Sequence, residues 1–219
     1  MRTDRTPILH VVGDSISLHY GPALEVMLTG IAAYSRKPMQ GSDPETANGR
    51  DSETVLAYLH SLSPALCRAI DYLMVNCGLH DLKRDTQTDA YQIPPERYAA
   101  NLAELVHFAI KRGPRLIWVQ TTPVVDTIHN RDPKRTFHRF AADVAHYNQI
   151  ADHIMAAASV PIIDLHHFTE TFGPGAYRDH VHYHDPACCN QAAFIAGALN
   201  QIIAFRQETR SYYVQSTHC

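Results

Sequence analysis

The sequence has little excess of charge of either sign. It holds 19 Lys and Arg residues against 22 Asp and Glu residues, which gives a formal net charge of −3 over 219 residues. Nucleic-acid-binding domains carry a marked basic excess, and solvating tails carry blocks of like charge. Neither pattern is present here, so we expect no nucleic-acid partner.

Long apolar runs are also missing. No stretch approaches the roughly 20 apolar residues of a membrane span. The N-terminal residues are polar up to Pro7 and lead directly into the apolar run at Ile8, without the apolar core of a secretory signal. We therefore expect no membrane partner and a cytoplasmic location.

The cysteines do not form a recognisable framework. There are five, an odd number, and only Cys188 and Cys189 are adjacent, which is a poor pattern for a disulfide or a zinc site. We expect reduced thiols. The sequence also lacks internal repeats and linkers, so we expect one domain over residues 1–219.

What the sequence does contain is an alternation of short apolar runs and longer amphipathic segments. Apolar, β-branched runs are typical of strands covered on both faces of a parallel sheet. The alternation predicts right-handed β-α-β units, with helices on both faces of the sheet. The expected strands are residues 8–12, 30–34, 71–77, 116–120 and 160–165. The expected helices begin near Pro22, after a cap at Asp51 or Ser52, at Pro94-Pro95, at Phe137 and at Asp185-Pro186.

Polar residues follow several of these strands directly. Ser15 comes after the first strand and Gly13, His80 follows Gly78, and Thr121 follows the strand that ends at residue 120. Carboxyl ends of parallel strands share one edge, where such sheets bind ligands. Ser15 at that edge is either a nucleophile or only the N-cap of the next helix.

A later segment could complete a nucleophilic site. Asp179 and His182 are three residues apart in a loop before the last helix, so the carboxylate can hold one imidazole nitrogen while the other faces a serine. The order Ser, Asp, His is that of α/β hydrolases, but the G-x-S-x-G turn is absent and the serine lies too early for that fold. The alternation of His180, His182 and His184 leaves a metal site as the alternative.

Four blocks in this order resemble those of the SGNH (GDSL-type) hydrolases. The blocks are Gly13-Asp14-Ser15, Gly49 in a loop, Gly78-Leu79-His80-Asp81 and Asp179-x-x-His182. The resemblance implies a three-layer α/β/α sandwich with a parallel, flavodoxin-like central sheet that hydrolyses or transfers acyl esters. It makes Ser15 the nucleophile, His182 the base and Asp179 the residue that orients the base.

The resemblance also implies an oxyanion hole. The family uses the serine N–H, the N–H of the second-block glycine and the side chain of a third-block asparagine. The first two positions correspond to Ser15 and Gly49, although Arg50 is an alternative alignment for the glycine. His80 stands where the family has asparagine, and its ring N–H could replace the amide. Asn76 is the alternative donor.

We therefore expect a serine esterase acting on a short acyl or acetyl ester of a small polar or carbohydrate substrate, without metal or cofactor. The alternatives are an O-acyltransferase of the same fold and an inactive module that binds a glycan or a partner. Among the remaining polar residues, we expect Asp14 and Asp81 to brace loops and Asn101 to be solvated. Trp118 is expected in the core.

Overall fold

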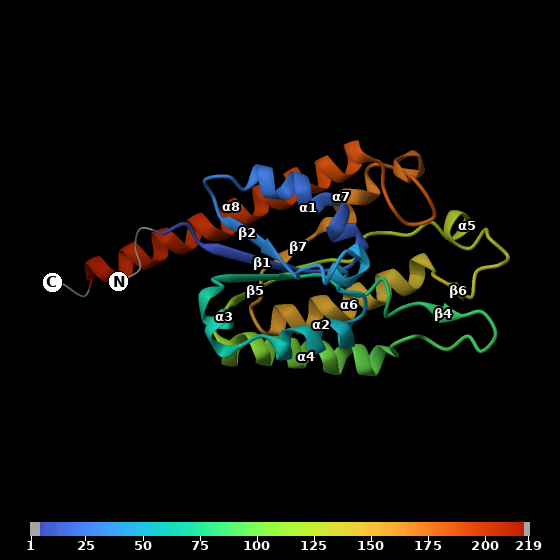
Figure 1. Cartoon of the computed structure of the whole chain (residues 1–219), viewed down its shortest axis with the longest axis horizontal. Helices are drawn as coiled ribbons and strands as arrows, with labels where there is room; N and C mark the ends of the chain where they lie inside the picture. The colour runs from blue at the N-terminus through green and yellow to red at the C-terminus, as the bar shows by residue number, and fades with distance from the viewer. Residues whose placement is uncertain (1–4, 217–219) are drawn as a thin grey trace.

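The computed structural model describes residues 5–216, and the side chains of residues 5–205. Its centre is a sheet of five parallel strands in the order β2-β1-β3-β5-β7 (Figure 1). The strands are β1 (Ile8–Val12), β2 (Ala33–Arg36), β3 (Tyr72–Val75), β5 (Arg115–Val119) and β7 (Ile162–Ile163). The four residues after Ile8 in β1 and all residues of β3 are buried, as expected for strands covered on both faces.

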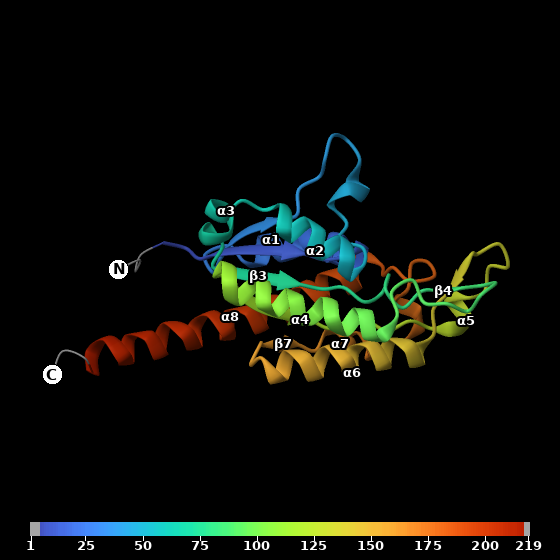
Figure 2. The same ribbon diagram turned by 90° about the horizontal axis from the view of Figure 1, so that it is seen from below.

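Helices cover both faces of this sheet (Figure 2). One face carries α1 (Ser15–Met27), α7 (Leu165–Glu170) and α8 (Asp185–Ser216), and α8 packs on the other two. The opposite face carries α2 (Ser52–Ser61), α3 (Pro64–Ala69), α4 (Pro95–Arg112) and α6 (Ala141–Ala157). The predicted three-layer α/β/α architecture is thus confirmed, with Trp118 fully buried at its centre.

Helix α1 begins seven residues before the predicted start at Pro22. The Asp14 carboxylate accepts the N–H of Ile16 at 3.0 Å and so caps the helix immediately after the Gly13 turn. Pro22 lies inside the helix, where the amphipathic pattern alone indicated a beginning. The capping interaction therefore decides the boundary.

A small antiparallel ribbon lies beyond the carboxyl ends of the sheet strands (Figure 1). It consists of β4 (Arg84–Asp85) and β6 (Phe137–His138), with α5 (Asp126–His129) beside it. The prediction of a helix from Phe137 is wrong, because the Phe137 and His138 backbone pairs with β4. Helix α6 begins only at Ala141.

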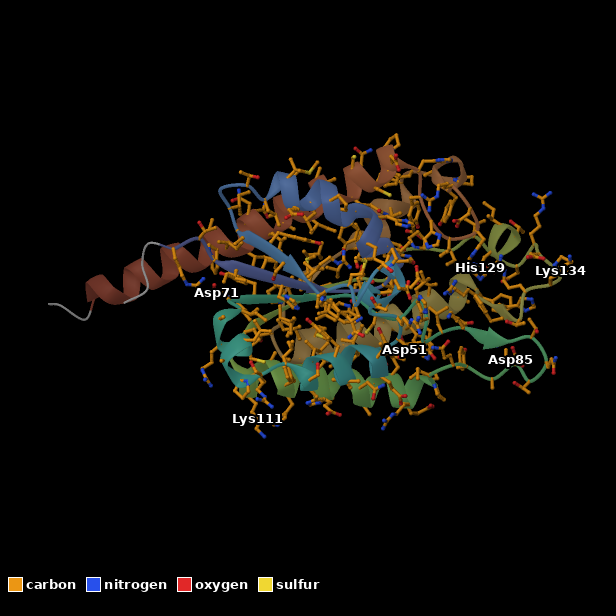
Figure 3. All side chains as sticks on the ribbon, viewed as in Figure 1. Asp51, Asp71, Asp85, Lys111, His129 and Lys134 are labelled. Atoms are coloured by element: carbon orange, nitrogen blue, oxygen red, sulfur yellow. The ribbon has the colours of Figure 1, made fainter. Side chains whose placement is uncertain are left out.

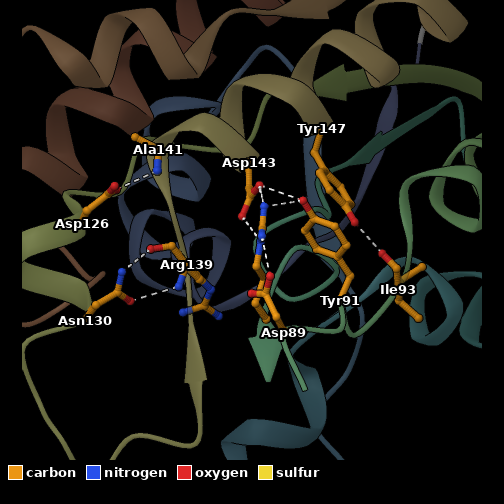
Figure 4. Close-up of polar contacts among 10 residues, drawn as sticks. Asp89, Tyr91, Ile93, Asp126, Asn130, Arg139, Ala141, Asp143 and Tyr147 are labelled. Carbon is orange, nitrogen blue, oxygen red and sulfur yellow. Dashed lines mark hydrogen bonds and ion pairs between the residues drawn. The ribbon is translucent and has the colours of Figure 1, made fainter. Parts of the chain in front are cut away.

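Partly buried polar contacts fix this ribbon to α6. Arg84 donates from Nε and Nη2 to both oxygens of Asp143, at 2.8 and 2.7 Å. The Tyr91 hydroxyl donates to the same carboxylate at 2.8 Å (Figure 4). The side chain of Asn130 donates to the carbonyl of Arg139 and accepts its N–H. The chain between β4 and α6 therefore has a defined position next to the sheet edge.

Four further short elements were not expected from the sequence. One is the helix α3; the 3₁₀ helix η1 (Pro44–Ala47) lies shortly before Gly49, and η2 (Pro174–Ala176) lies in the loop before α8. The fourth is α7, which holds His166 and His167 and begins at Leu165, the last residue of the predicted strand 160–165.

The last helix differs from the expectation about apolar runs. Residues Asp185–Phe205 of α8 are long and apolar enough to cross a membrane by length and composition, with a mean hydropathy of 1.2. Of this window, 39% is buried, by packing on α1 and α7. The core helix of a globular protein passes the same test, so the feature is weak evidence for a membrane segment.

The four cysteines that the structure describes are free thiols, as the sequence predicts. Cys67, Cys77, Cys188 and Cys189 are free, and the first three are buried. Cys219 lies outside the described residues.

Candidate active site

Ser15 is the first residue of α1, at the carboxyl end of β1. Its side chain is half-buried and takes no part in capping, because Asp14 is the N-cap. The N-cap interpretation of Ser15 is therefore wrong. As the first residue of a helix, its backbone N–H has no acceptor within the helix and is free to bind an anion.

The Ser15 hydroxyl lies next to the loop that follows η2. Its Oγ is 2.9 Å from Nε2 of His182, and Nδ1 of His182 is 2.8 Å from Oδ2 of Asp179. The carboxylate can only accept, so the ring hydrogen belongs on Nδ1 and leaves Nε2 to accept from Ser15. The structure thus joins three residues that are up to 167 positions apart.

Asp179 is held in its ionised form by its neighbours. Burial alone would raise the pKa of Asp179, but the backbone N–H groups of His182 and Val181 and the His182 ring outweigh it. These N–H groups donate to Oδ1 at 2.8 and 2.9 Å, and the pKa of Asp179 falls well below its usual value. The carboxylate consequently remains charged beside the imidazole.

The second block does not provide the donor that the sequence suggested. The N–H of Gly49 donates to the carbonyl of Gly13 at 2.8 Å, so it is not available to an oxyanion in this structure. This close approach explains the glycine, because a Cβ here would lie 2.9 Å from the same carbonyl oxygen. Arg50 has a φ of 54°, which glycine usually adopts, and its N–H donates to Asn48 Oδ1 at 2.8 Å.

His80 lies just beyond β3, the neighbour of β1 in the sheet. Its Nδ1 is 3.1 Å from Nζ of Lys83. A charged ammonium can only donate, so Nδ1 accepts and the ring hydrogen of His80 lies on Nε2. Burial, followed by the charge of Lys83, lowers the pKa of His80 to about 3, so the ring is neutral. Lys83 thereby selects the tautomer whose N–H is on Nε2, the nitrogen that Lys83 does not engage.

Asn76, the alternative donor, is committed elsewhere. Its amide donates to the carbonyl of Val119 at 3.0 Å, which links the ends of β3 and β5. The side chain is buried, at 7% exposure. Asn76 therefore braces the sheet edge, and His80 is the better candidate for the third donor.

Two carboxylates brace the loops around the site, as expected. Burial raises the pKa of Asp14 to about 6, although the N–H of Ile16 and the charge of Arg139 lower it. Asp81 is fully buried and accepts the backbone N–H and the hydroxyl of Ser52, which connects the third block to α2. Asn101 was expected in solvent, but it is buried and donates to Ser52 Oγ at 2.8 Å.

The neighbouring histidines form a separate chain of contacts. Arg135 Nη1 lies 3.3 Å from Nε2 of His180, and because a guanidinium only donates, His180 carries its hydrogen on Nδ1. That nitrogen is 3.0 Å from Nδ1 of His129. His180 therefore uses both ring nitrogens within the protein. No group of three or more His, Cys, Asp or Glu side chains in the described part of the chain could hold a metal.

Sequence reasoning did not find the residues that surround these histidines. Lys83, Arg135 and Arg139 all lie near the site, and no motif in the sequence indicates them. The sequence gives only their positions: Lys83 follows the third block, and Arg135 and Arg139 lie on either side of Phe137, the predicted start of a helix. The ribbon brings them together.

Comparisons with known proteins identify the fold. No family model matches the chain, and no curated protein matches its sequence. Solved structures do match. The lipase/acylhydrolase from Enterococcus faecalis has a TM-score of 0.67 at 17% identity, over 90% of this chain and 96% of that one. A GDSL-like lipase from Bacteroides thetaiotaomicron has a TM-score of 0.67 at 14% identity, over 89% and 88%.

A third structure is the acetylxylan esterase Axe2 from Geobacillus stearothermophilus. Its TM-score is 0.63 at 14% identity, over 91% of this chain and 96% of that one. The similarity in all three cases spans nearly the whole of both chains, so it concerns the complete architecture and not a shared sheet alone. The chain therefore has the SGNH (GDSL-type) hydrolase fold.

Proposed function

We propose that this protein is a serine esterase that hydrolyses a carboxylic ester of a small polar or carbohydrate substrate through an acyl-enzyme. The observation that carries the proposal is the chain of contacts from Ser15 Oγ through His182 to Asp179, at 2.9 and 2.8 Å. Nucleophile, base and orienting carboxylate are the parts that acyl transfer needs. The names of the similar structures, a lipase/acylhydrolase and an acetylxylan esterase, support an ester as the substrate class.

The proposed reaction begins with attack of Ser15 Oγ on the ester carbonyl, while its proton moves to Nε2 of His182. Asp179 stabilises the imidazolium that forms. The negative charge on the carbonyl oxygen is met by the Ser15 N–H and by Nε2–H of His80. Collapse of this intermediate breaks the ester C–O bond, and the alcohol leaves with the proton from His182.

Water then attacks the acyl-enzyme in the same way. His182 takes a proton from the water and returns it to Ser15 Oγ as the acid is released. If an alcohol takes the place of water, the product is a new ester. The O-acyltransferase alternative thus uses the same residues and differs only in the acceptor.

Labelling with a fluorophosphonate tests the nucleophile. We expect wild-type protein to be labelled on Ser15, and Ser15→Ala to be unlabelled and to lose activity by about 10⁶-fold. A panel of p-nitrophenyl esters of increasing acyl length, followed by acetylated sugars, defines the substrate. Partition of the acyl group between water and an added alcohol distinguishes hydrolysis from transfer.

Thermal unfolding of Ser15→Ala provides the control. Since Asp14 and not Ser15 caps α1, the substitution should leave the melting temperature nearly unchanged. An alanine variant that keeps a tenth of the activity would exclude the serine mechanism. Wild-type protein that is neither labelled nor active would favour the inactive binding module.

A further inference from the structure

Three cations surround one aromatic ring at the edge of the candidate site. Phe137 of β6 has Lys83 Nζ at 4.8 Å, Arg139 Cζ at 5.0 Å and Arg135 Cζ at 5.7 Å from its ring centre. We call these four residues the basic cluster. A ring quadrupole attracts each cation, but it does not neutralise any of them.

No carboxylate compensates this charge directly. Within the described chain, none of the three cations forms an ion pair, whereas Arg5, Arg84 and Arg97 do. The nearest acids act only at longer range, as Asp14 does on Arg139. The chain as a whole is slightly acidic, with a net charge of −3, so the cluster does not reflect a generally basic protein.

The hydrogen bonds of these cations go to neutral groups and leave donors unused. Lys83 donates to His80, Arg135 to His180, and Arg139 Nε to the carbonyl of Leu79 at 2.5 Å. Nε of Arg135 is buried without a partner. A charged donor without a partner is costly, so the guanidinium of Arg135 has unused capacity for hydrogen bonding.

The cluster is held in place by hydrogen bonds and lies beside the proposed catalytic residues. The reciprocal hydrogen bonds between Asn130 and Arg139 hold one side of it (Figure 4). Lys83 contacts His80, the proposed oxyanion donor, and the His180 ring that Arg135 contacts is 6.1 Å from the His182 ring. An anion bound here would therefore belong to the molecule whose ester lies at Ser15.

We propose that the ester substrate carries an anionic group, a carboxylate or a phosphate, which binds to Lys83 and Arg135 and is also attracted by the charge of the buried Arg139. This inference rests on the proposed esterase function and specifies its substrate class. The planar guanidinium of Arg135 can bind such an oxyanion with two parallel hydrogen bonds. His80 and His180 are neutral, so their contacts with Lys83 and Arg135 do not compensate the positive charges, which remain available to an anionic ligand.

Matched esters test this directly. On the alcohol side, 3-acetoxybenzoate and 3-acetoxyphenyl phosphate are compared with the neutral 3-acetoxybenzamide. On the acyl side, monophenyl adipate is compared with the phenyl ester of adipamic acid. We expect kcat/KM for the anionic member of at least one pair to exceed that of its neutral analogue by about tenfold or more, as for one charge-assisted hydrogen bond.

Arg135→Gln should lower this ratio of anionic to neutral kcat/KM about tenfold, and Arg135→Lys should keep most of it. The control is Lys111→Gln, which removes an exposed cation at the other end of the molecule from His129 and Lys134 (Figure 3) and should leave the ratio unchanged. If Arg135→Gln does not fold, Lys83→Gln and the salt dependence of wild type take its place. Raising NaCl from about 0.02 to about 0.5 M should reduce the ratio.

Binding to Ser15→Ala separates this inference from the proposed function. Dissociation constants for 3-acetoxybenzoate and 3-acetoxybenzamide, measured by ligand-observed NMR, do not require turnover. Tighter binding of the benzoate, lost in Ser15→Ala/Arg135→Gln, supports the anion site even if wild type hydrolyses neither ester. Equal binding of both compounds, together with equal kcat/KM within each ester pair, would overturn it while leaving the esterase proposal intact.

Discussion

The triad contains a histidine and the basic cluster contacts one, and these two histidines lie in opposite electrostatic surroundings. His182 lies 2.8 Å from the carboxylate of Asp179, which stabilises a proton on the ring. His80 lies 3.1 Å from the ammonium of Lys83, and burial together with that charge lowers the pKa of His80 to about 3. One histidine can therefore accept a proton during the reaction, while the other remains a neutral donor. The neighbouring charge, and not the residue type, assigns the role.

The two regions also differ in what holds them in place. The Asp179 loop is fixed by backbone donors to one carboxylate, which compensates its charge inside the protein. The ribbon is fixed by Arg84 and Asp143, whereas the cations beside it keep their charge. The charge of Asp179 is thus stabilised by groups of the protein itself, whereas the charge of the basic cluster is left for the anionic group of the proposed substrate. Four substitutions or conditions test this contrast.

The largest of these effects is expected from Asp179→Asn. The amide can present an N–H to Nδ1 of His182, which then carries its hydrogen on Nε2 and cannot accept from Ser15. A change of this kind in a serine triad lowers kcat by about 10⁴-fold, which steady-state kinetics on p-nitrophenyl acetate measures. The melting temperature checks that the loop remains folded. If the Asp179→Asn variant kept more than a tenth of wild-type kcat, the carboxylate beside His182 would not be what makes this histidine the base.

His80→Ala is expected to have the next largest effect. Removal of one oxyanion donor lowers kcat by roughly 10²–10³-fold, or about 3–4 kcal/mol in the barrier, with a smaller change in KM. His80→Asn should recover much of this loss, because an amide offers an N–H without a tautomer. If alanine lowers the melting temperature and leaves kcat unchanged, His80 has only a packing role.

A smaller effect is expected when Lys83 loses its proton. Burial, followed by the charge of Arg139, lowers the pKa of Lys83 to about 8. Above that pH the neutral amine can accept from Nδ1 of His80, so the donor on Nε2 is no longer enforced. We expect kcat for the neutral p-nitrophenyl acetate to fall several-fold as the pH rises through about 8.

His80→Asn is the matched control for this pH dependence. An asparagine donor does not depend on Lys83, so the decrease near pH 8 should be absent from that variant. An identical decrease in both proteins would assign it to another group and break the link between Lys83 and the His80 tautomer.

No effect is expected from chelation. Both ring nitrogens of His182 are engaged by Ser15 and Asp179, and both of His180 by His129 and Arg135. Activity should therefore survive dialysis against EDTA. Loss of activity that zinc restores would instead indicate a metal-activated water, the alternative raised by the alternating histidines.

Much of the architecture could be predicted because it depends on local features. The strand Ile8–Val12 and the beginning of the helix at Pro95 were placed correctly, from an apolar run and from a proline of the kind that opens helices. The boundary of α1 was missed because the Asp14 side chain, and not the apolar pattern, begins that helix. The same applies to Phe137, which pairs with β4, a strand more than fifty residues earlier.

The sequence by itself determined the order of the blocks and the residue types of the proposed triad, since each block is a short local turn. Only the tertiary structure decided which donors are free. The N–H of Gly49, which the second block suggested as a donor, is used by Gly13, and the amide of Asn76, the alternative donor, is bound to the carbonyl of Val119. Hydrogen bonds between distant segments depend on how the chain packs, and no local pattern encodes them. The unpaired cations around Phe137 have the same origin, because they become neighbours only when the ribbon folds over the sheet edge.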